Sequence, residues 1–405
     1  MASQTPLNLI FFTDEKADNF HPLTLTRPLD DLRVGILTIR EKWLKHLQLN
    51  DFSRLLPEYL VGVFGSRGIS GENDYLWINA RFLPSEKLIN AIHKLKQGEQ
   101  ITFDGNTVAA IANRETTKHM FDSNMFIKDN FSNNEITGVI HLEHLWDLLA
   151  LNSFEIDKDL PLIKLKPVSE TGYHNGTAIQ KPENVFVHET VKIEPGCILI
   201  GDDGPVIIQK GAVIEAGCIL RGPVVIGENA TLKMKARISG GTTIGPVCKV
   251  GGEVSNCIFH SYSNKAHEGF TGNSIFGQWV NIGADTNTSN LKNNYSTVRM
   301  ADWNSKNEME TEVQFLGTIM GDHSKTAINT MLNTGTLCGV SSNIFMAGFP
   351  PKYISSFSWV GSADYGIYDF DKAIEAMKAM MKRRDIELTE DYKNMMHHIF
   401  KEAHK

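Results

Sequence analysis

The stretch IQKGAVIEAGCILRGPVVIGENATLKMKARISGGTTIGPVCKV, residues 208–250, places an aliphatic side chain at every sixth position. These positions are Ile208, Ile214, Leu220, Ile226, Leu232, Ile238, Ile244 and Val250. A period of six fits neither the 3.6-residue repeat of an α-helix nor the alternation of an isolated strand. It fits a coil of three short strands in which every sixth residue points inward. The stretch therefore predicts a left-handed parallel β-helix of hexapeptide repeats, which we expect to span residues 177–350.

The same spacing continues on both sides of this stretch. An earlier set, in a shifted register, is Val187, Ile193 and Leu199, and a looser later set is Met320, Thr326, Leu332, Cys338 and Ile344. Several of these positions are followed by glycine: Gly227, Gly245, Gly283, Gly321 and Gly339. We expect these glycines to supply the backbone freedom that tight corners need.

Residues 1–160 show a different pattern, in which short apolar runs alternate with helical periodicity. Residues 7–12, 59–64 and 75–80 are expected as strands, and residues 35–47 and 85–95 as helices, the latter with Ser85 as N-cap. Residues 100–112 resemble a hairpin that turns at Asp104-Gly105. This alternation predicts an α/β domain.

Two further segments complete the expected organisation. Residues 161–176 are rich in proline and charge and are expected to form a linker. Residues 366–405 predict a C-terminal helical arm with Thr389 as an N-cap and an apolar stripe that lies on the β-helix or on a neighbouring subunit. The stripe comprises Tyr392, Met395, Met396, Ile399 and Phe400.

Composition excludes several classes of protein. The 405 residues carry a formal net charge of −7, which argues against nucleic acid or an anionic membrane as partner. The apolar run near the N-terminus is too short for a signal peptide or a membrane span, so we expect a cytoplasmic protein. The five cysteines are scattered and form no CxxC pair, which excludes a zinc ribbon and favours buried thiols.

One part of the repeat region, residues 263–294, is unexpectedly polar. A β-helix coil buries aliphatic residues and needs no such cluster, yet His267 and several asparagines occur here. An imidazole has a suitable pKa for a general base near neutral pH. The alternative is that His267 is simply exposed on a loop.

The motif KAHEGFTG…VNIGADTNTSN in this stretch resembles a known bacterial family. These are the bifunctional enzymes that join glucosamine-1-phosphate N-acetylation to N-acetylglucosamine-1-phosphate uridylyl transfer. Asn281 lies 14 residues after His267, which is the interval that this family keeps. The sequence departs from the family at Phe270, Asp285 and Leu291, where the family has tyrosine, glycine and tyrosine.

The resemblance implies roles for individual residues. His267 would be the general base of acetyl transfer from acetyl-CoA, and Asn281 and Asn290 would bind the sugar and the acetyl group. Lys265 and Arg237 are candidates for binding the sugar phosphate. A zinc site, as in β-helical carbonic anhydrases, would need three histidines, and only His260 and His267 are near in sequence.

A second resemblance lies near the N-terminus. NFHPLTLTRPLDDLRVG is similar to a stretch of the sugar-1-phosphate nucleotidyltransferases, with Arg27-Pro28 in the matching place. The glycine-rich phosphate loop of that family is missing, and Asn79 stands where it has a metal-binding aspartate. We expect Arg27, Arg33 and Arg81 to clamp the nucleotide phosphates instead.

Together these resemblances predict an enzyme of amino-sugar nucleotide synthesis that assembles as a homotrimer. Its β-helix would acetylate an amino-sugar phosphate. Residues 1–160 would couple a sugar-1-phosphate to a nucleoside triphosphate, with UTP expected, using Mg²⁺. Two alternatives stay open: a nucleotide-sugar-binding or scaffold protein with a degenerate first domain, and an acetyltransferase for another acceptor.

Overall fold

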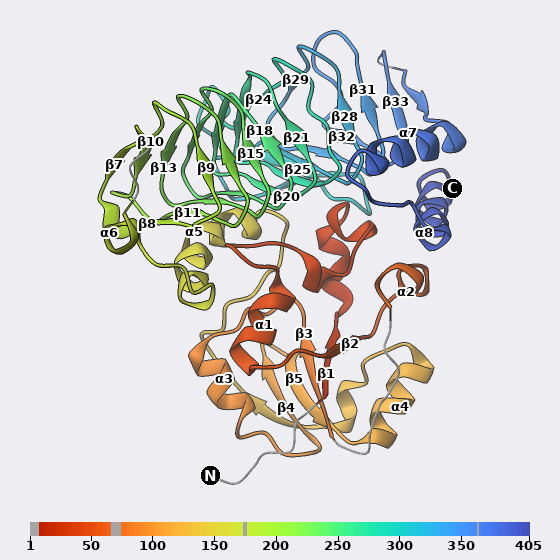
Figure 1. Cartoon of the computed structure of the whole chain (residues 1–405). Helices are drawn as coiled ribbons and strands as arrows, with labels where there is room; N and C mark the ends of the chain where they lie inside the picture. Colours follow the sequence, from red (N-terminus) through yellow and green to blue (C-terminus); the bar gives the residue numbers. More distant parts are fainter. Residues whose placement is uncertain (1–7, 66–73, 173–175, 363) are drawn as a thin grey trace. The chain divides into compact units, whose positions relative to one another are not determined.

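The computed structural model describes residues 8–65, 74–172, 176–362 and 364–405 (Figure 1). The chain divides into two compact units. The first comprises Met1–Phe20, Arg27–Leu32 and Leu37–His144, and the second comprises His21–Thr26, Arg33–Ile36 and Leu145–Lys405. In the described ranges, every helix is too short or too polar to cross a lipid bilayer.

The first unit is an α/β domain built on a six-stranded sheet of order β2-β1-β3-β5-β4-β6. Its strands are β1 (Asn8–Phe12), β2 (Phe52–Arg54), β3 (Tyr75–Asn79), β4 (Glu99–Phe103), β5 (Asn106–Ala112) and β6 (Ser132–Glu135). Its helices are α1 (Ile39–Leu47), α2 (Glu58–Phe64), α3 (Glu86–Ile92) and α4 (Arg114–Ser123). Strand β1 pairs in parallel with β2 and β3, whereas β5 is antiparallel to β3 and β4.

Most of the local predictions for this unit are confirmed. The hairpin of β4 and β5 turns at Asp104-Gly105, and Ser85 caps α3 by accepting a hydrogen bond from the backbone of Leu88. The predicted strand at 59–64 is wrong, because this segment forms α2. Only Leu60 of α2 is buried, so one side of a short helix satisfies the apolar run that we had expected to pair in the sheet.

The second unit is a parallel β-helix with three walls, as the six-residue period predicts. The first wall is a nine-stranded sheet of β8 (Val185–Val187), β11 (Val206–Ile208), β14 (Val224–Ile226), β17 (Thr242–Ile244), β20 (Ile258–Ser261), β23 (Ile275–Gln278), β27 (Thr318–Met320), β30 (Thr336–Cys338) and β32 (Tyr353–Ile354). The second wall contains β7 (Ala178–Gln180), β10 (Ile198–Ile200), β13 (Ile219–Arg221), β16 (Arg237–Ser239), β19 (Glu253–Ser255) and β22 (Phe270–Gly272), followed by the pair β24 (Asn287–Thr288) and β29 (Met331–Leu332).

The third wall has two sheets joined at a single residue. They are β9 (Lys192–Ile193), β12 (Val213–Ile214), β15 (Thr231–Leu232), β18 (Lys249–Val250) and β21 (Asn264–Lys265), then β28 (Lys325–Thr326), β31 (Asn343–Ile344), β33 (Ser358–Val360) and β34 (Gly366–Ile367). Asn281 makes β-bridges to Asn264 on one side and Lys325 on the other, so it continues the wall between the two sheets. An antiparallel hairpin of β25 (Arg299–Ala301) and β26 (Glu308–Glu310) leaves the coil before β27.

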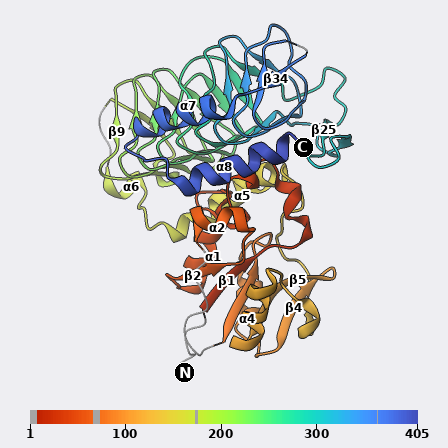
Figure 2. The ribbon, with the colours of Figure 1, turned by 90° about the vertical axis from the view of Figure 1, so that its right-hand side faces the viewer.

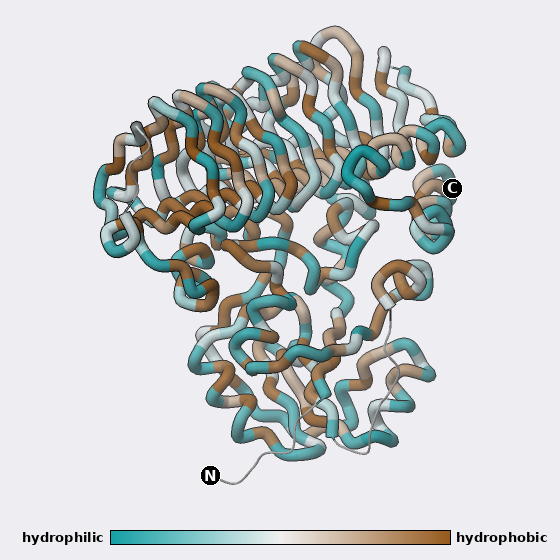
Figure 3. Tube along the Cα trace, viewed as in Figure 1, coloured by the Kyte–Doolittle hydropathy of each residue, from teal (hydrophilic) through white to brown (hydrophobic). Residues whose placement is uncertain are grey.

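The predicted inward register is confirmed. Ile208 pairs with Ile226 and Ile226 with Ile244, so one turn of this part of the coil consists of three hexapeptides. All eight residues of the repeat from Ile208 to Val250 are at most 1% exposed. Their aliphatic side chains form one continuous buried cluster, and Figure 3 shows apolar positions recurring from coil to coil.

The role expected for the glycines after the inward positions is wrong. Gly227, Gly245, Gly283, Gly321 and Gly339 do not have positive φ angles. A Cβ atom on Gly245 would instead lie 1.9 Å from the carbonyl oxygen of His260 in the next coil. These positions are glycine because neighbouring coils approach closely there, whereas the left-handed corner residues are mostly larger.

Four helices accompany the β-helix. They are α5 (Asp147–Asp159), α6 (Val168–Thr171), α7 (Phe370–Lys382) and α8 (Glu390–Ala403). Helix α6 lies within the predicted linker 161–176, of which residues 173–175 fall outside the described residues, and its Val168 belongs to the buried cluster of the β-helix. Helices α7 and α8 form the C-terminal arm, which lies along the β-helix of its own chain (Figure 2).

We predict that Ile226→Asp unfolds the β-helix or lowers its melting temperature strongly. Ile226 is fully buried between Ile208 and Ile244, and an inward carboxylate there would have no partner. The matched control is Val213→Asp, because Val213 is a partly exposed, outward residue of β12 on the third wall. Equal melting temperatures for the two variants in a thermal unfolding experiment would show that the inward register is wrong.

Candidate active site

The outer face of the third wall becomes polar in the middle of the β-helix. Lys249, Asn264 and Asn281 occupy successive outward positions, since the next residue in each strand or bridge is buried. The stretch singled out in the sequence, residues 263–294, supplies two of these three positions. These three polar residues therefore lie on the surface of the coil and not in its interior.

These outward positions form one side of a pocket of about 360 Å³. Its lining residues are Lys249, Tyr262, Asn264, Ala266, His267, Trp279, Asn281, Ile282, Gly283, Ala284, Ile328, Met380, Arg383 and Arg384. His267 and Asn281, the two residues of the motif interval, thus line the same pocket. Neighbouring coils bring them together, because β21 and Asn281 are adjacent in the third wall.

His267 lies at the corner that follows β21, and its side chain is exposed. Its backbone is fixed from inside the coil, because the ammonium of Lys265 donates hydrogen bonds to the carbonyl oxygens of His267, at 3.0 Å, and Gly251, at 2.9 Å. The next corner is held to this one by a hydrogen bond from the Asp285 amide to the Glu268 carbonyl. An exposed imidazole on a fixed corner can accept a proton from a bound ligand.

The structure does not support the predicted phosphate contact of Lys265. This residue occupies an inward position, opposite Val250 in the register, and is only 1% exposed. Burial lowers the pKa of its ammonium to about 8. Lys265 therefore positions the corner of His267 and does not line the pocket.

Arg237 and Asn290 also lie away from the pocket lining. Arg237 is on the outer side of the second wall, 46% exposed, and its guanidinium is 3.3 Å from Glu268. The side chain of Asn290 donates a hydrogen bond of 2.7 Å to that of Asn273, at the corner after β22. Within one chain, neither residue shares the site with His267, and their substrate-binding roles stay predictions.

An aromatic stack closes one end of the pocket. The rings of Tyr262 and Trp279 are stacked with centroids 4.5 Å apart, and His323 extends the stack at 6.1 Å from Trp279. All three residues have positive φ angles at the same corner of successive coils. The stacked rings thus occupy a left-handed corner conformation that large side chains rarely adopt, and they pack against one another there.

The C-terminal arm supplies a side of the pocket that we did not predict. Met380 near the end of α7 and the following Arg383 and Arg384 line it, and Arg384 donates a hydrogen bond of 3.3 Å to the side chain of Asn264. In the sequence, the basic run 382–384 has the usual composition of a helix C-terminus, where cations are favourable. Only the packing of the arm on the coil shows that these two arginines line the pocket.

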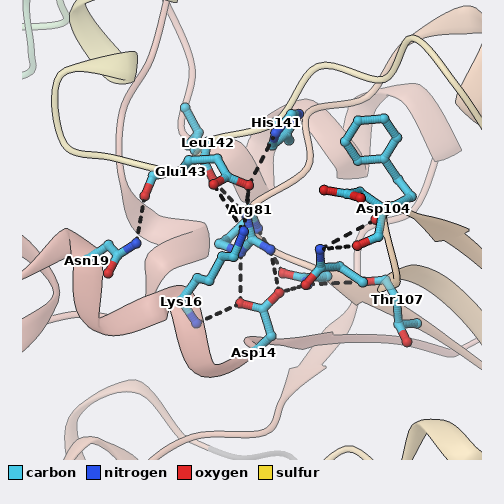
Figure 4. Close-up of polar contacts among 12 residues, drawn as sticks. Asp14, Lys16, Asn19, Arg81, Asp104, Thr107, His141, Leu142 and Glu143 are labelled. Carbon is cyan, nitrogen blue, oxygen red and sulfur yellow. Dashed lines mark hydrogen bonds and ion pairs between the residues drawn. The ribbon is translucent and has the colours of Figure 1, made fainter. Parts of the chain in front are cut away.

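A second pocket, of about 600 Å³, lies in the α/β domain at the ends of β1 and β3. Asp14 and Asn79 line it, together with Glu15, Lys128 and Asp129. The guanidinium of Arg81 donates two hydrogen bonds of 2.8 and 2.6 Å to the carboxylate of Asp14 (Figure 4). The side-chain amide of Asn79 donates a third hydrogen bond of 2.7 Å to the same carboxylate. Burial raises the pKa of Asp14, but the hydrogen bonds and charge of Arg81 outweigh it, so the pKa is lowered and the carboxylate is favoured.

The predicted arginine clamp has no support in this geometry. Arg27 and Arg81 are 2% and 0% exposed, do not line the pocket, and pair with Asp31 and Asp14. Arg33 belongs to the other compact unit and donates a hydrogen bond to the carbonyl of Ile36. These arginines were expected to face phosphates because of their charge, but carboxylates of the same domain already satisfy two of them.

Asp14 and Asn79 do not by themselves form a magnesium site in the pocket of the α/β domain, whose other lining carboxylates are Glu15 and Asp129. Mg²⁺ binds through carboxylates that are free to coordinate it. Here Asp14 is engaged by Arg81, and the side-chain oxygen of Asn79 accepts a hydrogen bond from the Arg81 amide. Among the described residues, no group of three His, Cys, Asp or Glu side chains could hold a metal ion.

Comparisons with known proteins identify similar sequences. Residues 9–167 match the family model described as sugar nucleotidyl transferase. The chain is similar to the bifunctional protein GlmU of Bartonella bacilliformis, with 36% identity over 131 residues that cover 31% of this chain and 29% of the relative. It is also similar to GlmU of Picosynechococcus sp., with 32% identity over 146 residues that cover 35% of this chain and 27% of the relative. The chain thus spans less than a third of the length of these two relatives.

Solved structures give weaker matches. A UDP-N-acetylglucosamine acyltransferase from Campylobacter jejuni gives a TM-score of 0.27 at 14% identity, covering 55% of this chain and 94% of that one. A mutant of AntD, an N-acyltransferase from Bacillus cereus solved with dTDP and coenzyme A, gives a TM-score of 0.21 at 11% identity, covering 53% and 95%. By its family match and its own geometry, the chain combines a sugar nucleotidyl transferase-like domain with a parallel β-helix. Over about a third of its length, its sequence is similar to that of the GlmU proteins.

We predict that Lys265 makes a contribution to the stability of the β-helix that rises between pH 8 and pH 10. Its folded pKa of about 8 lies below the ordinary lysine value of 10.5, so the unfolded chain binds more protons in this range. The charged form therefore opposes folding below pH 8, and this cost disappears as the pH rises toward 10.5. Lys325, whose pKa burial also lowers to about 8, contributes in the same direction, and the buried cysteines, whose pKa burial raises, contribute in the opposite one. In urea unfolding at several pH values, Lys265→Met should reduce the slope of the unfolding free energy against pH, whereas the exposed Lys192→Met should keep it. The same slope in both variants would contradict the assignment.

Proposed function

We propose that the pocket on the third wall is an acetyl-transfer site that moves acetyl from acetyl-CoA to the amine of an amino-sugar phosphate. The observation that carries the proposal is the placement of His267 and Asn281 in one pocket. The similarity to GlmU supports the same reaction class. The site offers an exposed imidazole, two outward amides and three cations, which suits a polar acceptor that carries an anionic group.

In this proposal the chemistry requires one proton acceptor. The acceptor nitrogen attacks the thioester carbonyl carbon, so that a C–N bond forms and the C–S bond breaks. His267 takes the proton from the nitrogen and returns it to the departing thiolate of CoA. Asn281 hydrogen-bonds the sugar, since its side-chain amide lines the pocket and its backbone amide is already bonded to the carbonyl of Ser324.

We predict that His267→Ala lowers kcat for acetylation of glucosamine-1-phosphate by about 10²- to 10⁴-fold. The KM for acetyl-CoA should change little, because a general base does not hold the donor. Asn281→Ala should raise the KM for the sugar phosphate instead. The control is His188→Ala, because His188 is partly exposed at a corner of the β-helix outside the pocket. Wild-type turnover by His267→Ala would make this residue an ordinary loop histidine, and lack of activity in the wild-type protein would reject the acetyl-transfer proposal.

For the α/β domain we propose binding of a nucleotide sugar in the pocket that Asp14 and Asn79 line. The second candidate is nucleotidyl transfer from UTP to a sugar-1-phosphate with Mg²⁺, which the family match over residues 9–167 favours. The contacts favour binding, because Asp14 is paired with Arg81 and the expected arginines do not line the pocket.

We predict that UDP-N-acetylglucosamine binds to the wild-type protein in calorimetry. Pyrophosphate release from UTP, Mg²⁺ and N-acetylglucosamine-1-phosphate should stay below about 1 s⁻¹, the lower end of ordinary enzyme turnover. Turnover of tens per second would establish nucleotidyl transfer as the role of this domain and contradict a binding role.

Homotrimeric assembly and a cytoplasmic location stay proposals that follow from the resemblance. Exposed apolar side chains on the second wall support the assembly, since Ile198 and Ile219 are each 37% exposed on neighbouring strands. In a homotrimer, a neighbouring subunit would cover these side chains. Sedimentation equilibrium measures the assembly directly.

A further inference from the structure

The C-terminal arm brings unpaired positive charge to the pocket. Lys249 from the coil and Arg383 and Arg384 from the arm all line it. Within the described ranges, none of these three side chains has a carboxylate within ion-pair distance. Glu215 of the third wall acts on Lys249, but it already forms an ion pair with Lys233 and accepts a hydrogen bond from the Met234 amide.

Arg384 has unused hydrogen-bonding capacity in the pocket. One of its terminal nitrogens donates to Asn264, but its Nε–H is buried and has no acceptor among the described residues. A buried guanidinium N–H without an acceptor in the protein is costly, and an ordered water, an ion or a ligand acceptor can satisfy it. The ligand that fits must be an acceptor of hydrogen bonds and must carry negative charge.

The surrounding electrostatics agree with this interpretation. Burial lowers the pKa of Lys249, and the charges of Arg384, Lys233 and Arg383 lower it further, while Glu215 acts in the opposite direction. Glu268, on the His267 side, pairs with Arg237. The cations thus repel one another, and an anion would relieve that repulsion.

The arm is fixed on the coil at several points, so its arginines are preorganised. Tyr392 of α8 hydrogen-bonds the His323 ring at 2.7 Å, and Phe357 packs against Phe370 and Phe400 with ring centroids 6.0 and 5.2 Å apart. Three residues of α7 and three of α8 are buried: Ala373, Met377, Met381, Met395, Met396 and Ile399. Preorganised charges bind a ligand without the entropy cost of ordering them.

We propose that the C-terminal arm completes the pocket as a phosphate-binding subsite, in which Arg383, Arg384 and Lys249 bind a phosphoryl group. Arginine suits this role because its planar fork donates two parallel hydrogen bonds to phosphate oxygens. The phosphoryl group belongs either to the acceptor sugar or to coenzyme A. The inference rests on the proposed acetyl transfer only for the identity of these two ligands.

The test measures binding and turnover separately. Calorimetry of glucosamine-1-phosphate, glucosamine and coenzyme A is carried out with the wild-type protein, with the Arg383→Gln/Arg384→Gln double variant and with Lys382→Met. Lys382 is the matched control, since it is an exposed cation at the end of α7 that does not line the pocket. Melting temperatures verify that the double variant is folded.

We predict that the double variant weakens binding of a phosphorylated ligand by about 10- to 100-fold, as expected for lost charge-assisted hydrogen bonds. Weaker binding of glucosamine-1-phosphate but not of glucosamine assigns the phosphate to the acceptor, and weaker binding of coenzyme A assigns it to the donor. In the acetylation assay the corresponding KM should rise with kcat nearly unchanged, in contrast to His267→Ala.

The inference would be overturned by equal binding of both phosphorylated ligands to the wild type and the double variant, or by no binding of either to the wild type. Failure of the proposed function is distinguishable from this. Phosphate-dependent binding without any acetylation would retain the subsite and reject acetyl transfer.

Discussion

The stacking of inward side chains from coil to coil is the interaction on which the rest of the β-helix depends. In the first wall the column runs through Ile208, Ile226, Ile244 and Phe259, and each residue pairs in register with the next. Because the inward side chains fix the height of each coil, they also fix which residues point outward at that height. Any site on the wall is therefore built from outward residues of successive coils, whatever their separation in the sequence.

The candidate active site lies where the inward column of the third wall changes from aliphatic residues to a lysine. In the third wall, Lys265 follows Val250 as an inward residue, and the turn from Val250 to Lys265 is shorter than the preceding turn from Leu232 to Val250. The ammonium of Lys265 has to find acceptors inside the coil, and it finds the carbonyls of Gly251 and His267. Lys265 thus interrupts the apolar column and, through these two hydrogen bonds, fixes the corner that carries His267.

Sequence periodicity was sufficient to predict the β-helix, because the inward positions obey one repeat and every member is buried. The interval of 14 residues between His267 and Asn281 also led us to expect both in one site, and both line the pocket on the third wall. The resemblance made Lys265 a candidate for the sugar phosphate, but its position is inward, opposite Val250, and a shortened turn of 15 residues hides this from the six-residue repeat. Arg383 and Arg384 were not expected at the pocket, because no local sequence pattern shows which wall a helical arm will cover. The sequence also does not show that Arg27 and Arg81 are buried, because their partners Asp31 and Asp14 are evident only when the chain is folded.

The proposed acetyl transfer requires that the amine of the acceptor and the acetyl donor bind together in the pocket between the third wall and the arm. The most direct measurement is a crystal structure of the protein with coenzyme A and glucosamine-1-phosphate. We predict that the sugar amine lies within about 2.6–3.2 Å of an imidazole nitrogen of His267, which is hydrogen-bond reach for a general base. A complex in which both ligands bind elsewhere on the β-helix, with His267 facing solvent, would contradict it.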